Sequence, residues 1–187
     1  MKKLIVILGP TASGKSALGV QLAKEFQGEI ISADSRQVYT GLDIGSGKIT
    51  KKEMGGVPHH LLDVASPKKQ FTVAQYCHLV KKAMAMITRQ GKIAILVGGS
   101  PLYIYALVDG WVIPEVKPNL ALRKQLGKLT TEQLFKNLQK LDPRRAKTIE
   151  QKNPRRLIRA IEIVMTTKKP VPLFQKHPLP YPVLLLG

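Results

Sequence analysis

Short apolar runs alternate with amphipathic stretches along the first part of the chain. Continuous apolar runs are typical of buried strands, and they occur at Leu4–Leu8 and Ile93–Val97; the segment Glu29–Ala33 also indicates a strand. Stretches with apolar residues at helical spacing predict helices at Ser13–Phe26, Thr72–Arg89 and Pro101–Val108. Because strands that alternate with helices usually pair in parallel, the pattern predicts an α/β fold around a parallel sheet.

The pattern changes after Trp111, where Pro114 and Pro118 mark a boundary. Four shorter and more polar helices are expected at Leu120–Lys128, Thr131–Leu141, Arg144–Ile149 and Arg155–Thr166. A proline-rich segment then leads to a strand-like run at Val183–Leu186. We therefore expect an α/β core over residues 1–113, a basic helical insertion over 114–180 and a strand over 181–187 that returns to the core. An apolar strand at a chain end usually has a neighbour after it, which suggests a truncated chain.

The composition fits a globular protein without a membrane segment. The chain has 187 residues, of which 44% are hydrophobic, and no apolar run approaches the roughly 20 residues that span a bilayer. The apolar run at Leu4–Leu8 ends in Gly-Pro, so it indicates a first strand and not a signal peptide. The single cysteine, Cys77, excludes an internal disulfide and fits a buried thiol in a reducing cytoplasm.

The net charge of the chain indicates that it binds a negatively charged partner. Lys and Arg number 30 against 12 Asp and Glu, for a formal net charge of +18. Such a field attracts polyanions, and nucleic acid is the partner that it favours. Charge alone cannot distinguish RNA from DNA, and a solvated lysine surface is the alternative.

One motif carries a specific chemistry. Two glycines four residues apart, followed by Lys-Ser, have the spacing of a phosphate-binding P-loop between a strand and a helix. Backbone amides in such a loop turn toward phosphate oxygens, Lys15 reaches the terminal phosphates, and Ser16 can ligate Mg²⁺. We expect the nucleotide- or diphosphate-binding residues to be Gly9, Pro10, Thr11, Ala12, Ser13, Gly14, Lys15 and Ser16.

Two further polar residues follow predicted strands. Asp34 comes directly after the second strand, and Ser100 follows Gly98-Gly99 after the third. The carboxyl ends of parallel strands meet at one edge of a sheet, so both side chains should face the phosphate site if these strands are neighbours. Asp34 could act as a general base, contact Mg²⁺ or cap a helix, and Ser100 could also be a helix cap.

Basic residues crowd the start of the last predicted helix. Arg155, Arg156 and Arg159 lie where the helix dipole disfavours positive charge, which an anionic partner would explain. A solvated face is the other possibility.

The adjacent His59 and His60 lack further ligands at zinc spacing, so we interpret them as structural.

Together these motifs resemble the tRNA dimethylallyltransferase (isopentenyltransferase) family over essentially the whole chain. The matching stretches are Gly-Pro-Thr-Ala-Ser-Gly-Lys-Ser at 9–16, Ile-Ser-Ala-Asp-Ser-Arg-Gln-Val-Tyr at 31–39, Asp-Ile-Gly at 43–45, Pro-His-His-Leu-Leu-Asp at 58–63, Val-Gly-Gly-Ser at 97–100, Leu-Asp-Pro at 141–143 and Asn-Pro-Arg-Arg-Leu-Ile-Arg-Ala-Ile-Glu at 153–162. A P-loop alone is widespread, whereas the ordered set is specific. The resemblance implies a P-loop NTPase-like parallel-sheet core with a small helical insertion.

The resemblance also implies a reaction and its residues. A dimethylallyl group would move from dimethylallyl diphosphate to N6 of an adenine next to the tRNA anticodon, with Mg²⁺ as cofactor. Asp34 matches the family's general base, and Ser100 matches a residue that helps to place the adenine and the leaving group. The positions implied to contact tRNA are Asp34, Ser35, Arg36, Gln37, Ser100, Arg123, Arg155, Arg156, Leu157, Ile158 and Arg159. We expect a cytoplasmic monomer with no membrane partner.

Two departures from the family pattern matter. Ser100-Pro101 stands where many tRNA-type members have Thr-Gly, and serine here is similar to the adenylate isopentenyltransferases. The chain also stops where the family continues into C-terminal helices, so a chain of this length could be inactive.

Three alternatives remain: a small-molecule P-loop kinase, an adenylate prenyltransferase and a non-catalytic nucleic-acid-binding module. A kinase would leave the basic second part without a purpose, and a binding module would leave Asp34 and the P-loop without one.

Overall fold

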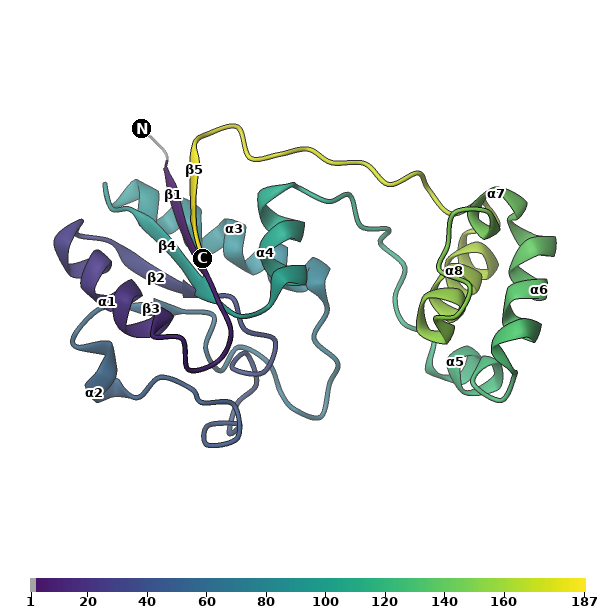
Figure 1. The fold of residues 1–187 in the computed structure, drawn as a ribbon, viewed down its shortest axis with the longest axis horizontal. Coiled ribbons are helices and arrows are strands. Elements are labelled where there is room, and N and C mark those ends of the chain that lie inside the picture. Colours follow the sequence, from purple (N-terminus) through teal and green to yellow (C-terminus); the bar gives the residue numbers. More distant parts are fainter. Residues whose placement is uncertain (1–2) are drawn as a thin grey trace. The chain divides into compact units, whose positions relative to one another are not determined.

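The computed structural model describes residues 3–187, which form two compact units (Figure 1). An α/β unit contains the chain up to Val112 together with Lys176–Gly187, and a helical unit contains Ile113–Gln175. The return to the α/β unit thus comes at residue 176, before the expected 181. The reason is local pairing, because the N–H of His177 donates to the Gly110 carbonyl and that of Leu179 to the Val108 carbonyl.

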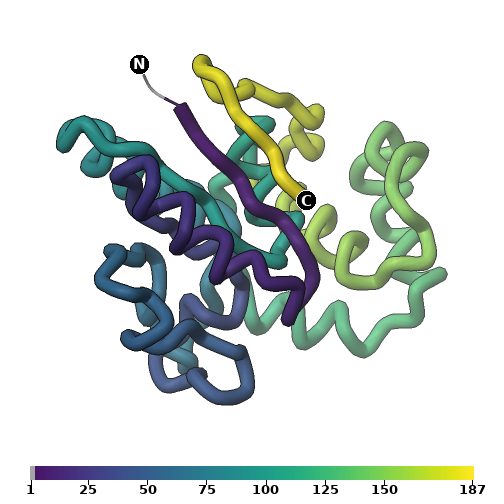
Figure 2. Tube along the Cα trace, turned by 60° about the vertical axis from the view of Figure 1, so that its left-hand side comes forward, coloured from purple at the N-terminus to yellow at the C-terminus, as the bar shows by residue number. Residues whose placement is uncertain are grey.

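The α/β unit is built on a five-stranded sheet in which every pair of neighbouring strands is parallel. Its strands are β1 (Leu4–Leu8), β2 (Glu29–Ser32), β3 (His59–His60), β4 (Ala94–Gly98) and β5 (Val183–Leu186), in the order β3-β2-β4-β1-β5. Strand β5 runs alongside β1, as Figure 2 shows, with Leu4 opposite Val183. The parallel α/β fold is therefore confirmed, although sequence analysis missed β3. Two residues are too few to show a hydrophobic period.

Strand β4 lies between β1 and β2 and pairs with both. Leu8 lies opposite Gly98, and Ser32 lies opposite Val97. A common site for the P-loop, Asp34 and Ser100 required that their three strands be neighbours in the sheet. Strands β1 and β2 do not pair with each other, but each of them pairs with β4, so the three strands are adjacent. The loops that follow these three strands consequently leave the sheet at the same edge.

Helices cover both faces of this sheet because its strands are apolar on both sides. Helix α1 (Lys15–Glu25) packs through Val20 and Ala23 on Ile7, Ile30 and Ile95. Helices α3 (Val73–Arg89) and α4 (Pro101–Val108) pack on the other face, formed by residues such as Val6, Ile31 and Leu96. The short α2 spans Lys51–Met54. Helix α3 begins in a capping box in which Thr72 and Gln75 bond each other's backbone N–H.

The helical unit contains α5 (Leu120–Leu126), α6 (Thr131–Leu141), α7 (Pro143–Ala146) and α8 (Pro154–Thr167). Its own core includes Leu134, Leu138, Leu157 and Ile161, which are almost completely buried. Asn119, Asp142 and Asn153 cap three of these helices through side-chain oxygens, so the polar residues before each helix define where it starts. Among residues 3–187, no helix has the length and apolar character needed to cross a membrane.

Candidate functional site

The P-loop joins the end of β1 to the start of α1 and leaves the helix start uncapped by any side chain. Gly14 precedes the helix with φ 81°, and Ala12 has φ 64°, so both residues adopt left-handed backbone conformations. No acidic residue lies in the first turn of α1. Free backbone N–H groups and the positive end of the helix dipole favour an anion here. The Lys15 ammonium donates to the Pro10 carbonyl at 2.7 Å, which keeps it over the loop.

The loops after β1, β2 and β4 are joined by backbone hydrogen bonds. The N–H of Gly9 donates to the Gly98 carbonyl, and the N–H of Ser100 donates to the Ala33 carbonyl at 3.1 Å. A pocket of about 80 Å³, open to solvent, lies at this edge of the sheet. It is lined by Thr11, Ala12, Lys15, Ser16, Asp34, Gln37, Ser46, Gly47, Val97 and Gly98. The structure thus brings the predicted phosphate loop and Asp34 into one site.

Gly98 allows this close approach. A Cβ atom at this position would lie 2.1 Å from the Ala33 carbonyl oxygen, a distance that no side chain tolerates. The glycine therefore lets the backbone after β2 pass directly against the end of β4. Ala33 immediately precedes Asp34, so this contact also determines where the carboxylate stands.

Asp34 has one oxygen engaged and one available. Its Oδ1 accepts hydrogen bonds from the N–H groups of Arg36 at 2.7 Å and Gln37 at 3.3 Å. Within residues 3–187, Oδ2 makes no hydrogen bond. The side chain is half-buried. Asp34 therefore organises its own turn, and it also presents a carboxylate oxygen that can accept a proton.

Ser100 is not a side-chain cap for α4. Although it occupies the N-cap position, its hydroxyl makes no capping bond and instead accepts the N–H of Ser35 at 2.9 Å. The alternative that Ser100 serves as a helix cap is therefore excluded by the geometry. Its hydroxyl lies beside the backbone that carries Asp34.

Gln37 faces inward and braces a loop of the pocket. Its amide nitrogen donates to the carbonyls of Ser46 and Gly47, and its amide oxygen accepts from Ser32. The neighbouring Ser35 and Arg36 are exposed at the same edge of the sheet. Sequence analysis missed Ser46 and Gly47 as lining residues, because only folding brings residues 42–47 back over the P-loop.

The pocket contains oxygen ligands that suit a magnesium ion bound together with a phosphate. The Ser16 hydroxyl makes no hydrogen bond within the described chain, and the Asp34 carboxylate lines the same pocket. No group of three His, Cys, Asp or Glu side chains that could hold a metal occurs among residues 3–187. Mg²⁺ needs no such cage, since it retains water and takes phosphate oxygens as ligands.

The two histidines of the predicted structural pair bond to protein groups. The ring Nε2 of His60 lies 2.7 Å from a Glu29 carboxylate oxygen, and the ring Nδ1 of His59 lies 2.8 Å from the Val57 carbonyl oxygen. Glu29 also accepts from Lys92 at 2.6 Å. The His60–Glu29 bond attaches the short edge strand β3 to β2, and the His59 bond is local, in agreement with a structural role for both histidines. Burial raises the pKa of the half-buried Cys77 thiol, which keeps it protonated and unreactive.

In the helical unit, two of the expected tRNA-binding arginines form an internal ion-pair network. Arg123 donates from Nε and Nη2 to the two oxygens of Glu162, both at 2.8 Å. Arg159 reaches the same carboxylate at 2.6 Å and also bonds the carbonyls of Val116 and Pro114. Glu162 has no exposed surface. Although burial alone would raise it, the hydrogen bonds from Arg123, the Asn119 N–H and Arg159 lower the pKa of Glu162 to about 2.

The remaining residues of the arginine segment divide into exposed and buried positions. Arg155 and Arg156 are exposed on the first turn of α8, where Arg156 pairs with Glu150 at 3.3 Å. Leu157 is 0% exposed and belongs to the core, so the expectation that it contacts tRNA is wrong for its side chain. The helical period accounts for this, because a helix that packs on a core cannot expose every residue of its first two turns.

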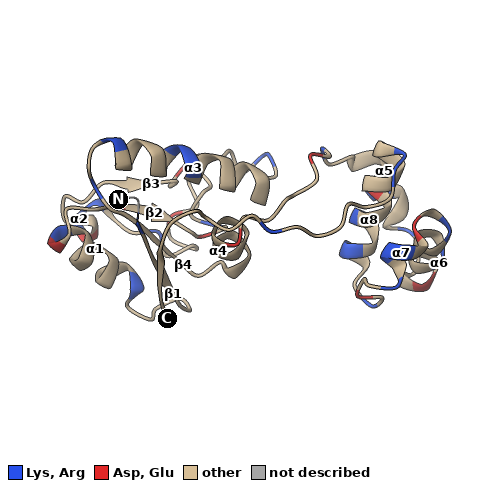
Figure 3. Cartoon of the chain, turned by 90° about the horizontal axis from the view of Figure 1, so that it is seen from above, with Lys and Arg blue, Asp and Glu red and all other residues tan. Residues whose placement is uncertain are grey.

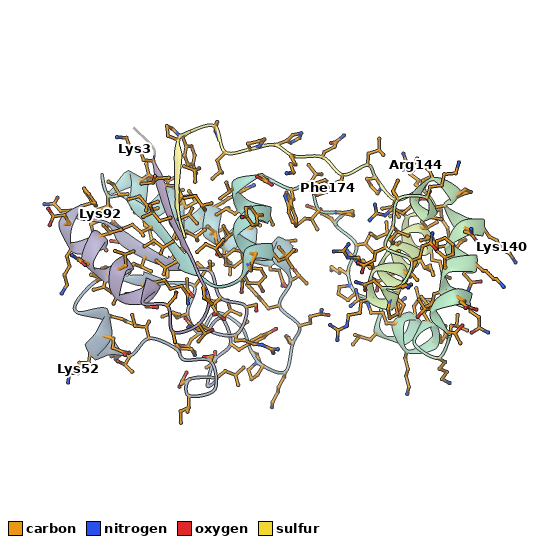
Figure 4. The ribbon with its side chains drawn as sticks, viewed as in Figure 1. Lys3, Lys52, Lys92, Lys140, Arg144 and Phe174 are labelled. Atoms are coloured by element: carbon orange, nitrogen blue, oxygen red, sulfur yellow. The ribbon has the colours of Figure 1, made fainter. Side chains whose placement is uncertain are left out.

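Lys and Arg residues cover the outside of the helical unit. Figure 3 shows basic residues on α7 and α8, and Figure 4 shows Lys140 pointing outward. Residues 113–175 carry fifteen Lys and Arg against five Asp and Glu. Because Glu162 and Asp142 are buried, much of the negative charge is withdrawn from the surface. The outer face of the helical unit is therefore suited to a polyanion.

A family model, IPP transferase, matches residues 37–187 of the chain. The chain belongs to the IPP transferase family. A tRNA dimethylallyltransferase of Roseiflexus sp. is 45% identical over 91% of the chain, and one of Anoxybacillus flavithermus is 41% identical over all of it. The resemblance that the motifs predicted is thus confirmed. The chain spans 57% and 61% of the length of these two relatives.

Solved structures give the same result for this IPP transferase chain. The full-length tRNA isopentenylpyrophosphate transferase of Bacillus halodurans is 41% identical, with a TM-score of 0.60 over 91% of the chain and 57% of its own length. A eukaryotic dimethylallyltransferase acting on tRNA is 33% identical, with a TM-score of 0.76 over 90% of the chain and 43% of its own length. The P-loop and Asp34 precede the part matched by the family model but lie inside the full-length match to the Anoxybacillus relative.

Proposed function

We propose that this chain carries the catalytic site of a tRNA dimethylallyltransferase. In this reaction, N6 of an adenine next to the tRNA anticodon attacks C1 of dimethylallyl diphosphate. A C–N bond forms, the C–O bond to diphosphate breaks, and the electron pair leaves with diphosphate. The single observation that carries the proposal is the shared pocket of the P-loop and Asp34 in a chain of the IPP transferase family.

The P-loop is proposed to hold the diphosphate. The uncapped amides at the start of α1 and the Lys15 ammonium would bind its oxygens and stabilise the negative charge that grows as it leaves. Ser16 would hold Mg²⁺, whose charge neutralises the leaving diphosphate when it is bound. Holding C1 in line with the adenine amine would remove much of the entropic barrier.

Asp34 is the proposed general base. An adenine amine is a weak nucleophile, and it must lose a proton as the new bond forms. The free Oδ2 of Asp34 could accept this proton, while Oδ1 stays fixed by the two backbone N–H groups. Ser100 is proposed to position this carboxylate and the adenine, since it bonds the next residue along the backbone. Adenine has to leave its stack to reach this pocket.

The acceptor proposed is tRNA, in agreement with the names of the relatives and with the charge of the chain. Ser35 and Arg36 beside the pocket and Arg155, Arg156 and Ile158 on α8 are the proposed contacts in direct reach of RNA. Arg123 and Arg159 would contribute through their outer edges. Relatives named for tRNA modification favour this acceptor over the free nucleotide of an adenylate prenyltransferase and over a kinase substrate. We propose a cytoplasmic, monomeric enzyme.

The test is transfer of label from radioactive dimethylallyl diphosphate. The purified chain would be incubated separately with unmodified tRNA, AMP and ATP, with and without Mg²⁺. We expect label on tRNA alone, and only with the metal. Label on AMP or ATP would instead indicate an adenylate prenyltransferase. If a chain extended to the length of its relatives also transferred no label, the proposed reaction would be wrong.

A further inference from the structure

The loop between β2 and α2 carries an apolar side chain that is completely uncovered. Ile44 is 99% exposed, at the tip of residues 42–47. Leu42 before it and Val64 on the next loop are also about two-fifths exposed. An isolated β-branched side chain held in water gains free energy from any apolar contact that covers it. The Ile44 tip therefore has the chemistry of a contact site for an apolar surface.

The Ile44 tip is braced on both sides. The ammonium of Lys48, whose side chain is 6% exposed, donates to Asp43 and Asp63 at 2.6 Å each and to the Tyr39 carbonyl at 3.0 Å. Gln37 holds the carbonyls of Ser46 and Gly47. These bonds anchor the residues on either side of Ile44 to the loops after β2 and β3. A loop backbone that is already held in place loses little conformational entropy when its tip binds.

The location of the loop connects it to the active site. Ser46 and Gly47, two and three residues after Ile44, line the pocket that also contains Lys15 and Asp34. Any acceptor whose reactive atom reaches Asp34 must therefore pass close to this loop. The small diphosphate donor, held by the P-loop, has no need of a contact outside the pocket.

The charge around the tip selects the kind of surface that it can bind. The ion-pair cluster of Lys48 with Asp43 and Asp63 contains two carboxylates and one ammonium. It therefore carries net negative charge, which disfavours phosphate oxygens. Unpaired RNA bases present apolar ring faces, and isoleucine and leucine side chains can replace a neighbour in a nucleic-acid stack. The features of the Ile44 tip fit a base and not a backbone contact.

We propose that Ile44 is a preformed wedge that packs against a base of the acceptor RNA beside the adenine that enters the pocket. This inference rests on the proposed function for its acceptor. The wedge fills the gap left in the stack, so it stabilises the state in which the target adenine is extruded. Lys48 and Gln37 are positioning residues for it.

The test uses the whole 187-residue chain and an anticodon stem-loop RNA with 2-aminopurine at the target adenine. The fluorescence of this base rises when it unstacks, so it reports extrusion without any transfer. Ile44→Ala should weaken RNA binding about fivefold and lower the fluorescence reached at saturating protein. Ile44→Leu should retain both properties. Met86→Ala, which trims another partly exposed apolar residue on α3, should change neither.

The outcomes separate this inference from the proposed reaction. If wild-type chain transfers label to RNA but Ile44→Ala matches it in affinity and fluorescence, the wedge is wrong and the reaction stands. If Ile44→Ala binds RNA more weakly and extrudes the base less than wild type, but a full-length chain transfers no label, the reaction is wrong and the wedge stands. A shift from dimer to monomer in Ile44→Ala, by light scattering, would show that a second copy covers Ile44 and would overturn the wedge.

Discussion

The hydroxyl of Ser100 accepts a hydrogen bond from the backbone N–H of Ser35, 65 residues earlier in the chain, at 2.9 Å. The bond connects the loop after β4 to the loop after β2, immediately beside Asp34. The Ser100 N–H donates in turn to the Ala33 carbonyl at 3.1 Å. Ser100 therefore holds the backbone on both sides of the proposed general base.

Replacing Ser100 by alanine should remove the hydrogen bond to the Ser35 N–H while the pocket still binds dimethylallyl diphosphate. We expect kcat for tRNA prenylation to fall roughly tenfold, because the Asp34 carboxylate loses its fixed orientation. The KM for dimethylallyl diphosphate should change little, since the P-loop is intact. Steady-state kinetics with both substrates would measure this. Ser100→Thr keeps the hydroxyl and should be close to wild type, and equal loss in both variants would argue against the hydrogen bond.

Asp34→Asn should separate binding from chemistry. An asparagine oxygen can still accept the N–H groups of Arg36 and Gln37, so the turn should persist, but the amide cannot take a proton. We expect transfer to fall by a factor of about 100 or more, with RNA affinity unchanged. Single-turnover transfer and filter binding would give the two quantities. Retained activity would show that another group accepts the adenine proton.

Gly98→Ala should be strongly destabilising. The added methyl group would meet the Ala33 carbonyl oxygen at 2.1 Å, so strands β2 and β4 or their loops would have to separate. We expect the free energy of unfolding to fall by about 3 kcal/mol or more. Gly45→Ala is the matched control, because a methyl group there has no neighbour within 4 Å. Urea unfolding of both variants would measure the difference, and equal stabilities would contradict the close approach.

Glu162 should make the stability of the chain dependent on pH in acid. Its pKa is about 2 in the folded chain and about 4.5 in an unfolded one, so the carboxylate is stabilised by folding. The contribution, about 3 kcal/mol, is fully present above pH 4.5 and is lost as the pH falls toward 2. Glu162→Gln should be less stable at pH 7 and should flatten the curve between pH 4.5 and 2. Thermal unfolding across this range would test the prediction.

Lys48→Met should release the Ile44 loop while the P-loop stays folded. Asp43 and Asp63 would lose their shared ammonium, and we expect a loss of about 2 kcal/mol in stability. Proteolytic cleavage within residues 40–48 should become faster, as mass spectrometry of the fragments would show. Lys51→Met removes one charge from exposed helix α2 and serves as the control. Unchanged cleavage in Lys48→Met would mean that Gln37 alone braces the loop.

Much of the α/β unit follows from local sequence patterns. Strands β1, β4 and β5 are apolar runs, β2 contains two adjacent isoleucines, and the P-loop is a contiguous motif whose glycines and lysine act within one turn. Asp34 and Ser100 could be assigned to the site because parallel strands deliver their carboxyl ends to one edge. Strand β3 could not be predicted, since it forms only by pairing with β2 and by the bond from His60 to Glu29.

The helical unit shows where local patterns end. Sequence alone determined that its helices are short, capped by polar residues and rich in arginine, since each of these properties depends on neighbours along the chain. Tertiary structure decided which arginines face an internal acid, because Arg123 and Glu162 are 39 residues apart and meet only when α5 packs on α8. It also decided that Ser46 and Gly47 reach the phosphate pocket. Such contacts depend on chain packing across long separations, and no periodicity in the sequence records them.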